Sequence, residues 1–329
     1  MKYGVGVDIG ATYTRVVVAD EEGNFLVKKG DRTVSRGDSM AITRQVASLI
    51  RAALREAGVD EREVKGIGIG SIGPLDIKRG IIVKPANLPF ENVPLVAPLR
   101  EEFGCQVTLV NDCVAAVIGE RVFGAGREHE NLVYVTISTG IGGGVYVDGR
   151  VLLGKDGNAH EIGHMVVDPE GRLVCGCGGR GHWEAYSSGT GIPNLARLII
   201  SEKPRDEVES SLLYSLVSGR LEELTAKHVY DAAKKGDRLA REVVDRASFY
   251  NVLGFANIIS VYDPSLITVG GAVALNNPDL VLPPIKEKVE GYTINRVPEI
   301  KLTPLGPDVG LYGAVALALG LEEIRRYTT

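Results

Sequence analysis

The stretch YGVGVDIGATYTRVVVADEEGNFLVKK, residues 3–29, contains the pattern that predicts the fold. Its first apolar segment predicts a strand that ends in Asp8, and the small residues that follow predict a tight turn. A second strand is expected over 15–19 and a third over 25–29, with an acidic turn between them. The stretch is therefore a strand–loop–strand–turn–strand unit.

The same pattern recurs in VYVTISTGIGGGVYVDGRVLL, residues 133–153. A strand is expected over 133–137, a loop over 138–144 and a strand over 145–147, followed by an Asp-Gly hairpin turn and a third strand. Two related units in one chain predict an α/β fold with two lobes that face a ligand cleft.

Helical patterns fill the segments between and after these units. Ser39 is expected to cap a helix that ends at Gly58. Asp237 is expected to cap a long helix that runs to about Val261, and a helix rich in small residues is expected over 309–319.

Composition limits the classes of function. The chain has 329 residues, of which 44% are hydrophobic and 24% charged, as in ordinary globular proteins of two domains. Its net charge is −5 without long basic or acidic runs, so charge gives no reason to expect nucleic acid or a membrane as a partner. Four Cys form no disulfide framework, and neither a signal peptide nor a spanning segment is recognisable, so we expect a cytoplasmic protein.

Both predicted loops contain residue types that bind phosphate. Glycines let backbone N–H groups approach an anion closely, and hydroxyl groups add donors. Asp8, at the end of a strand, could hold a metal-bound water beside a triphosphate. A single Gly-rich hairpin is often purely structural, but the paired occurrence favours a nucleotide. The candidates are Gly10, Thr12, Thr14, Ser138, Thr139, Gly140, Gly142, Gly143 and Gly144.

A candidate metal site lies in HEIGHMVVDPEGRLVCGCGGRGHWEAYSS, residues 160–188. His164, Cys175, Cys177 and His182 offer two imidazoles and two thiolates, a set suited to tetrahedral zinc. Four protein ligands leave no open position, which indicates a structural ion. Isolated His and Cys residues usually have no metal, but three of the five His and two of the four Cys fall within this stretch.

Three further residues of this stretch are interpreted differently. His160 is not expected to be a ligand. Glu161 and Glu184 alternate with the ligands without being needed by the metal, which indicates a rigid polar pocket for a hydroxylated ligand.

Taken together, the motifs resemble the ROK family of sugar kinases and sugar-responsive repressors, within the actin/hexokinase-like superfamily with its ribonuclease H-like lobes. The resemblance covers essentially the whole chain, and two further segments, G-P-L-D at 73–76 and N-L-P-F at 87–90, resemble the family's sugar-facing loop. The matching motifs, in order, are D-I-G-A-T-x-T-R at 8–15, N-D at 111–112, S-T-G-I-G-G-G at 138–144, E-I-G-H at 161–164, C-x-C-G-x-x-G-H-x-E at 175–184 and V-G-G-A at 269–272.

The chain departs from the family pattern at three positions. His182 stands where a third Cys is usual, which keeps a ligand but makes the set Cys2His2. His160 replaces a small residue before E-I-G-H, and Phe90 replaces a frequent Trp.

The resemblance implies ATP-dependent phosphorylation of a hexose. A sugar hydroxyl that attacks the γ-phosphorus must lose its proton, and Asp112 is the candidate base. The alternative is that Asp112 only caps the helix expected over 113–123. The resemblance further implies that the sugar is held by Gly73, Asn87, Asn111, Glu161, His164 and Glu184.

The resemblance also assigns the cofactors ATP, Mg²⁺ and a structural Zn²⁺. Thr12, Thr139 and Gly140 would contact phosphates together with magnesium, and Gly270 and Gly271 would border the adenosine. It implies a small lobe of residues 1–112 plus 306–329, a larger lobe of residues 113–305, and a homodimer or homotetramer.

Glucose is the expected substrate, with other hexoses tolerated. The alternatives are kinases for N-acetylmannosamine, N-acetylglucosamine, fructose or allose. A sugar-sensing repressor would need a DNA-binding segment, which we do not expect because the first strand already begins at Tyr3. A non-catalytic actin-like scaffold would explain neither the metal ligands nor Asp112.

Overall fold

The computed structural model describes residues 2–85 and 88–322, which form two compact units. Unit 1 comprises Met1–Tyr134, Gly144–His160 and Thr303–Thr329, and unit 2 comprises Val135–Gly143 and Glu161–Leu302. The expected boundary after residue 112 differs from this division, because the helix that follows it packs within unit 1. Which functions belong to which lobe stays a prediction.

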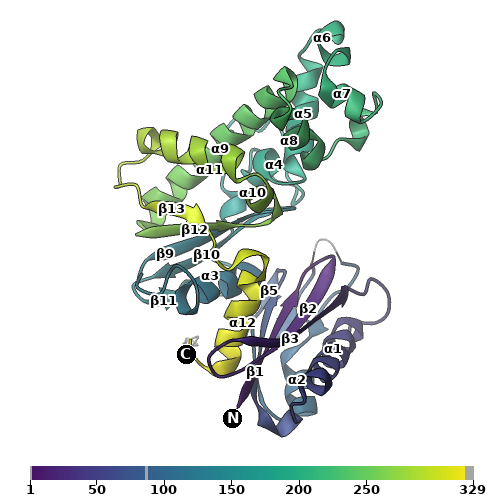
Figure 1. Ribbon diagram of the computed structural model, residues 1–329, viewed down its shortest axis with the longest axis vertical. Helices are drawn as coiled ribbons and strands as arrows, with labels where there is room; N and C mark the ends of the chain where they lie inside the picture. The colour runs from purple at the N-terminus through teal and green to yellow at the C-terminus, as the bar shows by residue number, and fades with distance from the viewer. Residues whose placement is uncertain (1, 86–87, 323–329) are drawn as a thin grey trace. The chain divides into compact units, whose positions relative to one another are not determined.

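Unit 1 is built on a five-stranded sheet with the order β3-β2-β1-β4-β8 (Figure 1). Strands β1, β2 and β3 are antiparallel neighbours, whereas β1, β4 and β8 run parallel. The unit expected over residues 3–29 is therefore confirmed. The strands are β1 Tyr3–Ile9, β2 Tyr13–Ala19, β3 Phe25–Arg32, β4 Val64–Ser71 and β8 Gln106–Asn111; a small sheet contains β5 Leu75–Asp76, β6 Ile81–Ile82 and β7 Val93–Pro94.

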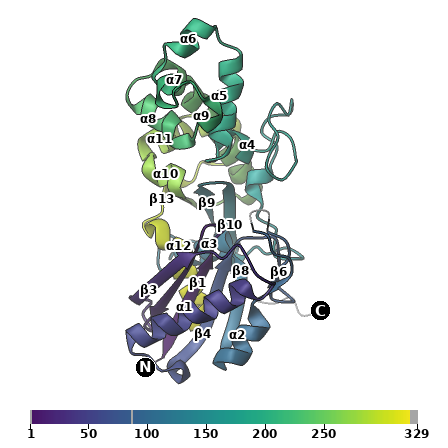
Figure 2. The ribbon, with the colours of Figure 1, turned by 90° about the vertical axis from the view of Figure 1, so that its right-hand side faces the viewer.

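Helices cover both faces of this sheet (Figures 1 and 2). Helices α1 (Ala41–Ala57) and α2 (Val96–Phe103) pack on one face, and α3 (Asp112–Val122) and α12 (Val309–Leu319) on the other. Small residues let α3 and α12 approach closely: a Cβ at Gly313 would lie only 1.6 Å from a backbone oxygen of α3. The small-residue pattern of the last helix is thus a packing requirement.

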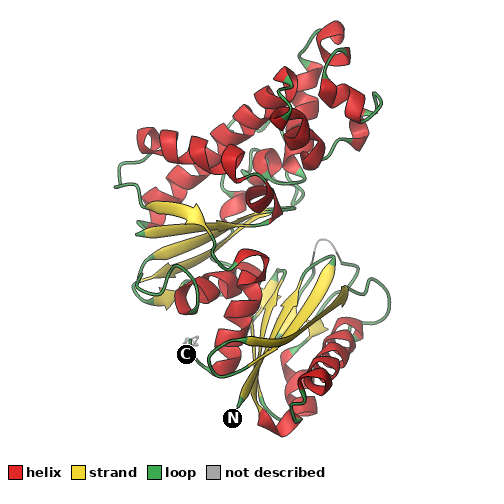
Figure 3. Cartoon of the chain, in the orientation of Figure 1, coloured by secondary structure: helices red, strands yellow, loops and turns green. Residues whose placement is uncertain are grey.

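A second five-stranded sheet has the order β11-β10-β9-β12-β13, and the border between the units runs through β9 and β10. Unit 2 is otherwise mostly helical (Figure 3). The strands are β9 Leu132–Ile137, β10 Ile141–Val147, β11 Arg150–Val151, β12 Leu266–Gly270 and β13 Glu299–Leu302. The helices are α4 Glu184–Ser187, α5 Gly191–Ser201, α6 Arg205–Glu209, α7 Leu212–Leu216, α8 Ala226–Lys234, α9 Arg238–Tyr262, α10 Ala272–Asn276 and α11 Pro278–Lys288. Short 3₁₀ turns lie at Glu61–Glu63, Ile162–His164, Leu221–Glu223, Val289–Tyr292 and Gly306–Asp308.

The predicted helix ends are only partly right. The stop at Gly58 is confirmed by its left-handed φ of 67°. The Ser39 cap is wrong, since α1 begins after Met40, whose N–H donates to the Asp38 carboxylate at 3.1 Å. Asp237 does cap α9 by accepting the Ala240 N–H at 2.7 Å. Within the described ranges, no helix has both the length and the apolar character to cross a bilayer.

Candidate functional site

Unit 1 gathers polar residues where three parallel strands end. The pairing register places Ile9 opposite Ser71, and Ser71 opposite Asn111. Because the carboxyl ends of parallel strands meet at one edge, Asp8 and Asp112 lie at the same edge of the sheet. The start of α12 adjoins both residues, since a Cβ at Gly310 would lie 4.0 Å from Asp8 Oδ1 and 3.8 Å from the Asp112 carbonyl oxygen.

Asn111, and not Asp112, occupies the N-cap position of α3. Its Oδ1 accepts the Cys113 N–H at 2.8 Å, and the Oδ1 of Asp112, the first helical residue, lies at the same distance from that N–H. Both side chains therefore support the start of α3, and the role of Asp112 as the base stays a prediction. With Oδ1 used in the cap, Asn111 directs its Nδ2 towards Gly73, where an added Cβ would lie 3.7 Å away.

Asp8 forms an ion pair with Arg15, a residue of the D-I-G-A-T-x-T-R motif for which the sequence indicated no role. Arg15 donates Nε and Nη2 to Asp8 Oδ2 at 3.0 and 2.5 Å, and its Nη1 reaches Asp308 Oδ1 at 3.0 Å. Lys28 Nζ binds the other Asp308 oxygen at 2.7 Å. Burial raises the pKa of Asp8, and the charge of Arg15 offsets that rise only in part. This network links the end of β1 to the start of α12.

The first predicted phosphate loop is a four-residue turn that Thr33 of the next segment supports. The Gly10 N–H donates to the Tyr13 carbonyl oxygen at 2.9 Å, and Thr12 is exposed. Thr33 Oγ1 donates to the Gly10 carbonyl oxygen at 2.7 Å. The expected phosphate contact of Thr14 must be corrected: this strand residue is fully buried, and its hydroxyl pairs with that of Thr33 at 3.0 Å.

The second loop is shorter than expected and is supported by residues distant in sequence. Strand β10 already begins at Ile141, so the loop comprises only Ser138–Gly140, and the prediction of a loop to residue 144 is wrong. The N–H groups of Gly189 and Thr190 donate to the carbonyl oxygens of Ser138 and Thr139, at 2.6 and 3.2 Å. Thr190 Oγ1 donates to the Thr139 carbonyl oxygen as well, at 3.0 Å.

Two further glycines of this region, Gly144 and Gly271, are required by close backbone contacts. Gly142, Gly143 and Gly144 lie within β10, and a Cβ at Gly144 would lie 2.0 Å from the Cys113 carbonyl oxygen. Gly271 follows β12 with a φ of 87°, and a Cβ there would lie 2.5 Å from the Ile137 carbonyl oxygen. The Gly270–Gly271 segment therefore adjoins the start of the Ser138–Gly140 loop.

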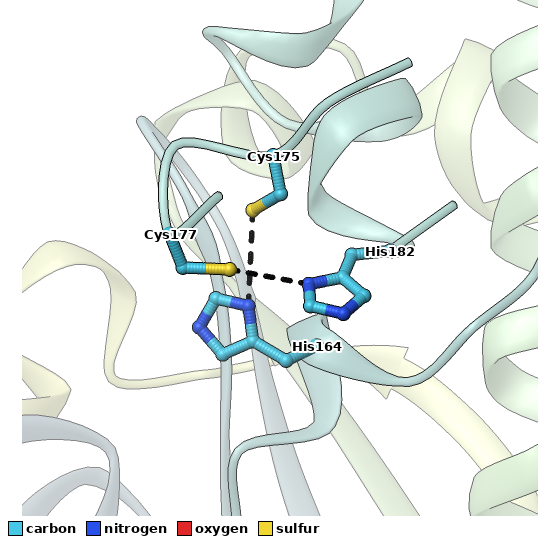
Figure 4. A group of neighbouring side chains, drawn as sticks. All are labelled: His164, Cys175, Cys177 and His182. Atoms are coloured by element: carbon cyan, nitrogen blue, oxygen red, sulfur yellow. Dashed lines mark hydrogen bonds between the residues drawn. The ribbon is translucent and has the colours of Figure 1, made fainter. Parts of the chain in front are cut away.

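The four predicted metal ligands come together in unit 2 (Figure 4). Their ligand atoms all lie within 4.8 Å of one another. Cys175 Sγ lies 3.8 Å from His164 Nδ1, and Cys177 Sγ lies 3.3 Å from His182 Nδ1. In a tetrahedral zinc site, a sulfur ligand and a nitrogen ligand are about 3.5 Å apart. The geometry fits one tetrahedral ion.

Burial shifts the pKa values of two residues of the cluster, and only the shift of His182 favours the form that binds a metal. Burial is the main reason why the pKa of Cys175 is raised to about 12, whereas a cation on the sulfur would favour the thiolate. Burial lowers the pKa of His182, and this favours the neutral imidazole that binds metals. His160 is not part of the cluster; it is buried, with Nε2 3.2 Å from the Gly157 carbonyl oxygen.

Two carboxylates flank the cluster, as the sequence indicated. Glu161 Oε2 lies 3.7 Å from His164 Nε2, the ring nitrogen turned away from the cysteines. Glu184 touches the cluster and the second loop at once: Oε1 lies 3.3 Å from Cys175 Sγ, and Oε2 accepts the Ile141 N–H at 2.9 Å. A Cβ at Gly140 would lie 2.4 Å from Glu184 Oε2, so a larger residue there would displace this carboxylate.

One predicted residue cannot be placed, and two residues that support the loops were not predicted from the sequence. Asn87 lies outside the described residues. Arg15 could have been found, because a turn closed from Gly10 to Tyr13 places it opposite Asp8. The support of the second loop by Thr190 has no local signal in the sequence.

The sequence profile of the ROK family matches residues 4–320. The chain belongs to the ROK family. It is 38% identical over 320 residues to a glucokinase of Pyrobaculum calidifontis, an alignment that covers 97% of this chain and 96% of that relative.

Solved structures of the ROK family agree with this assignment. A ROK family glucokinase from Streptomyces griseus in complex with glucose and AMPPNP matches with a TM-score of 0.78 at 32% identity, covering 96% of this chain and 98% of the other. A ROK hexokinase from Thermus thermophilus matches with a TM-score of 0.80 at 32% identity, covering 97% and 98%. The expected α/β fold of actin-like type is thereby confirmed.

Proposed function

We propose that this ROK protein is a glucokinase that transfers the γ-phosphoryl group of ATP to glucose and forms glucose 6-phosphate. The observation that carries the proposal is the similarity to glucokinases over nearly the full length of both chains. One of those structures holds glucose together with AMPPNP, a molecule shaped like ATP. The chain's own residues fit the parts that this reaction needs.

Asp112 is the proposed general base. The glucose hydroxyl oxygen forms a bond to the γ-phosphorus as the bond to the leaving ADP breaks, and the hydroxyl proton passes to the Asp112 carboxylate. Asn111 would bind a sugar hydroxyl through Nδ2, since its Oδ1 caps α3. Gly73 would leave room for the sugar beside that amide, and Asn87 would provide another sugar contact.

The residues around the metal cluster would hold the other sugar hydroxyls. Glu161, His164 through Nε2, and Glu184 are the proposed contacts. Zinc held by His164, Cys175, Cys177 and His182 would supply a fixed geometry for the loops that carry these side chains.

The nucleotide would use both turns. Gly10, Thr12, Thr139, Gly140 and Gly142 are the proposed phosphate contacts, and Gly270 and Gly271 would border the adenosine. Asp8 would hold a magnesium-bound water, where the ion neutralises charge on the phosphates. Arg15 would keep the Asp8 carboxylate in place through its two N–H groups.

A coupled assay that detects ADP formation tests the proposal directly. Glucose, N-acetylmannosamine, N-acetylglucosamine, fructose and allose are offered with ATP and Mg²⁺, and glucose should give the highest kcat/KM. A higher value for another sugar would correct the substrate, and no turnover with any of them would refute the kinase. Sedimentation of the same sample checks the predicted homodimer or homotetramer.

A further inference from the structure

One tyrosine hydroxyl connects three segments of the metal-binding region. Tyr186 lies on α4, two residues after Glu184, and its ring is fully buried. Its hydroxyl accepts the Leu173 N–H at 2.9 Å, two residues before Cys175. The same hydroxyl donates to Asp168 Oδ2 at 2.5 Å.

Asp168 is a buried carboxylate for which the proposed reaction has no use. Only 4% of the residue is exposed. It follows His164 by four positions, and Oδ2 also accepts the backbone N–H and Nε of Arg172, at 3.1 and 3.2 Å. Burial alone would raise the pKa of Asp168, but the hydrogen bonds from Tyr186 and Arg172 outweigh it and lower the pKa. The carboxylate is therefore a charged acceptor at neutral pH.

The network ends on the long helix of unit 2. Arg172 Nη2 donates to the Tyr250 hydroxyl of α9 at 2.7 Å, and the rings of Tyr186 and Tyr250 pack with centroids 4.2 Å apart. Helix α4 is fixed to α9 by further bonds, since Trp183 Nε1 donates to Asn251 Oδ1 at 2.9 Å. The segment between the proposed ligands His164 and His182 has little regular structure, only isolated bridges and turns.

We infer that the Tyr186 hydroxyl and the Asp168 carboxylate are positioning groups that hold the metal-ligand segments and Glu184 in their binding geometry. A side chain that fixes a ligand segment before the metal arrives removes an ordering cost from metal binding. The consequence for glucose rests on the proposed function, because it requires Glu184 to contact the sugar. The predicted effect on zinc affinity does not rest on the proposed function.

Tyr186→Phe tests the inference, because it removes one hydroxyl and leaves the ring that packs on Tyr250. Competition with a chromophoric chelator should show zinc affinity reduced about 10–100-fold. The KM for glucose should rise about 3–10-fold with kcat nearly unchanged, since a disordered Glu184 weakens sugar binding and not the chemistry. Excess zinc should restore much of the lost glucose affinity.

Two other tyrosines provide matched controls. Tyr230→Phe removes a buried hydroxyl from α8 of the same unit and should leave zinc affinity unchanged. Tyr250→Phe removes the outer bond to Arg172, together with the interaction of the hydroxyl with Arg246, and should have an intermediate effect. Equal zinc affinities in Tyr186→Phe and Tyr230→Phe would overturn the inference, as would a glucose KM that excess zinc does not lower. Failure of the wild-type protein to phosphorylate glucose would refute the proposed function, while the zinc affinities would still decide this inference.

Discussion

The two Gly-containing turns begin from the same local pattern but are held in different ways. In unit 1, the turn from Gly10 to Tyr13 is supported by Thr33, which directly follows the neighbouring strand β3. In unit 2, the loop Ser138–Gly140 is supported by Thr190 and by Glu184, which belong to the segment that follows the proposed metal ligands.

The difference shows where each turn obtains its rigidity. The first turn depends on hydrogen bonds within the antiparallel strands β1, β2 and β3, which are consecutive in the sequence. The second depends on a segment whose conformation is tied to the metal cluster through Glu184 and Cys175. Loss of the metal should therefore disturb the second turn and leave the first intact, while the chemical step should depend on the sheet edge of unit 1.

The largest effect is expected at that sheet edge. Asp112→Asn keeps the shape and an oxygen near the Cys113 N–H but removes the base, so kcat should fall by about 10²–10⁴-fold with little change in glucose affinity. Asp20→Asn, a turn carboxylate of the same unit, is the control and should retain kcat. Near-normal turnover of Asp112→Asn would mean that the residue only supports the start of α3.

Removal of the metal should have the next largest effect. The wild-type protein should contain about one zinc per chain, and Cys177→Ser should lose it, because a Cys2His2 set cannot spare a thiolate. The Tm of unit 2 should fall by roughly 5–10 °C, since metal-binding energy is folding energy. The KM for glucose should rise about 10–100-fold, and the KM for ATP should rise less.

The same change outside the cluster is the control for this experiment. Cys105→Ser makes the substitution in unit 1, away from the metal ligands, and should keep both zinc and glucose affinity. Full glucose affinity and an unchanged Tm in zinc-free Cys177→Ser would show that the metal has no part in positioning Glu184.

A matched pair of Thr→Val variants separates the two turns. Thr33→Val removes the hydroxyl that donates to Gly10, and Thr190→Val the hydroxyl that donates to Thr139. Each lost hydrogen bond is worth about 1 kcal/mol, so the KM for ATP should rise roughly 2–10-fold in each variant. The rise in the KM for ATP on zinc removal should add fully to the rise in Thr33→Val. It should add only partly to the rise in Thr190→Val, because the metal and Thr190 both support the second turn. If the two effects add equally in both variants, the second turn does not depend on the metal more than the first.

Sequence reasoning succeeded where the signal is local. The first hairpin and the stop at Gly58 follow from residue types at short spacing, and the structure confirms both. The four expected metal ligands lie close together, and their binding of zinc stays a prediction. It failed where glycine has more than one use: Gly142–Gly144 suggested a loop, but these residues lie in β10, and Gly144 is small because α3 packs against it. Composition alone cannot distinguish these uses of glycine.

Contacts between distant segments lay beyond the sequence pattern. Thr14 was expected to contact a phosphate, but it is fully buried and its hydroxyl pairs with that of Thr33. Nothing near Asp168 in the sequence indicates that its partner is Tyr186, because that pairing depends on how the segment 164–182 folds back onto α4. Both cases depend on tertiary packing, which residue spacing does not encode.

The smallest predicted effect compares Asp8, whose side chain is 15% exposed, with the buried Asp168. Burial raises the pKa of Asp8, so the stability it contributes is present below the unfolded pKa of about 4 and is lost as pH rises through its folded pKa. The pKa of Asp168 is lowered by its hydrogen bonds, so its contribution is present above about pH 4 and is lost as pH falls through its folded pKa. The stability difference between wild type and Asp8→Asn should therefore fall with rising pH, and that between wild type and Asp168→Asn should rise. Urea titrations from pH 3 to 7 on metal-depleted protein measure both, with the fluorescence of buried Trp183 reporting unit 2 and hydrogen exchange in β1 reporting unit 1. A difference that falls with rising pH for both variants would show that burial controls both carboxylates, and one that rises for both would show that hydrogen bonds and charged partners do.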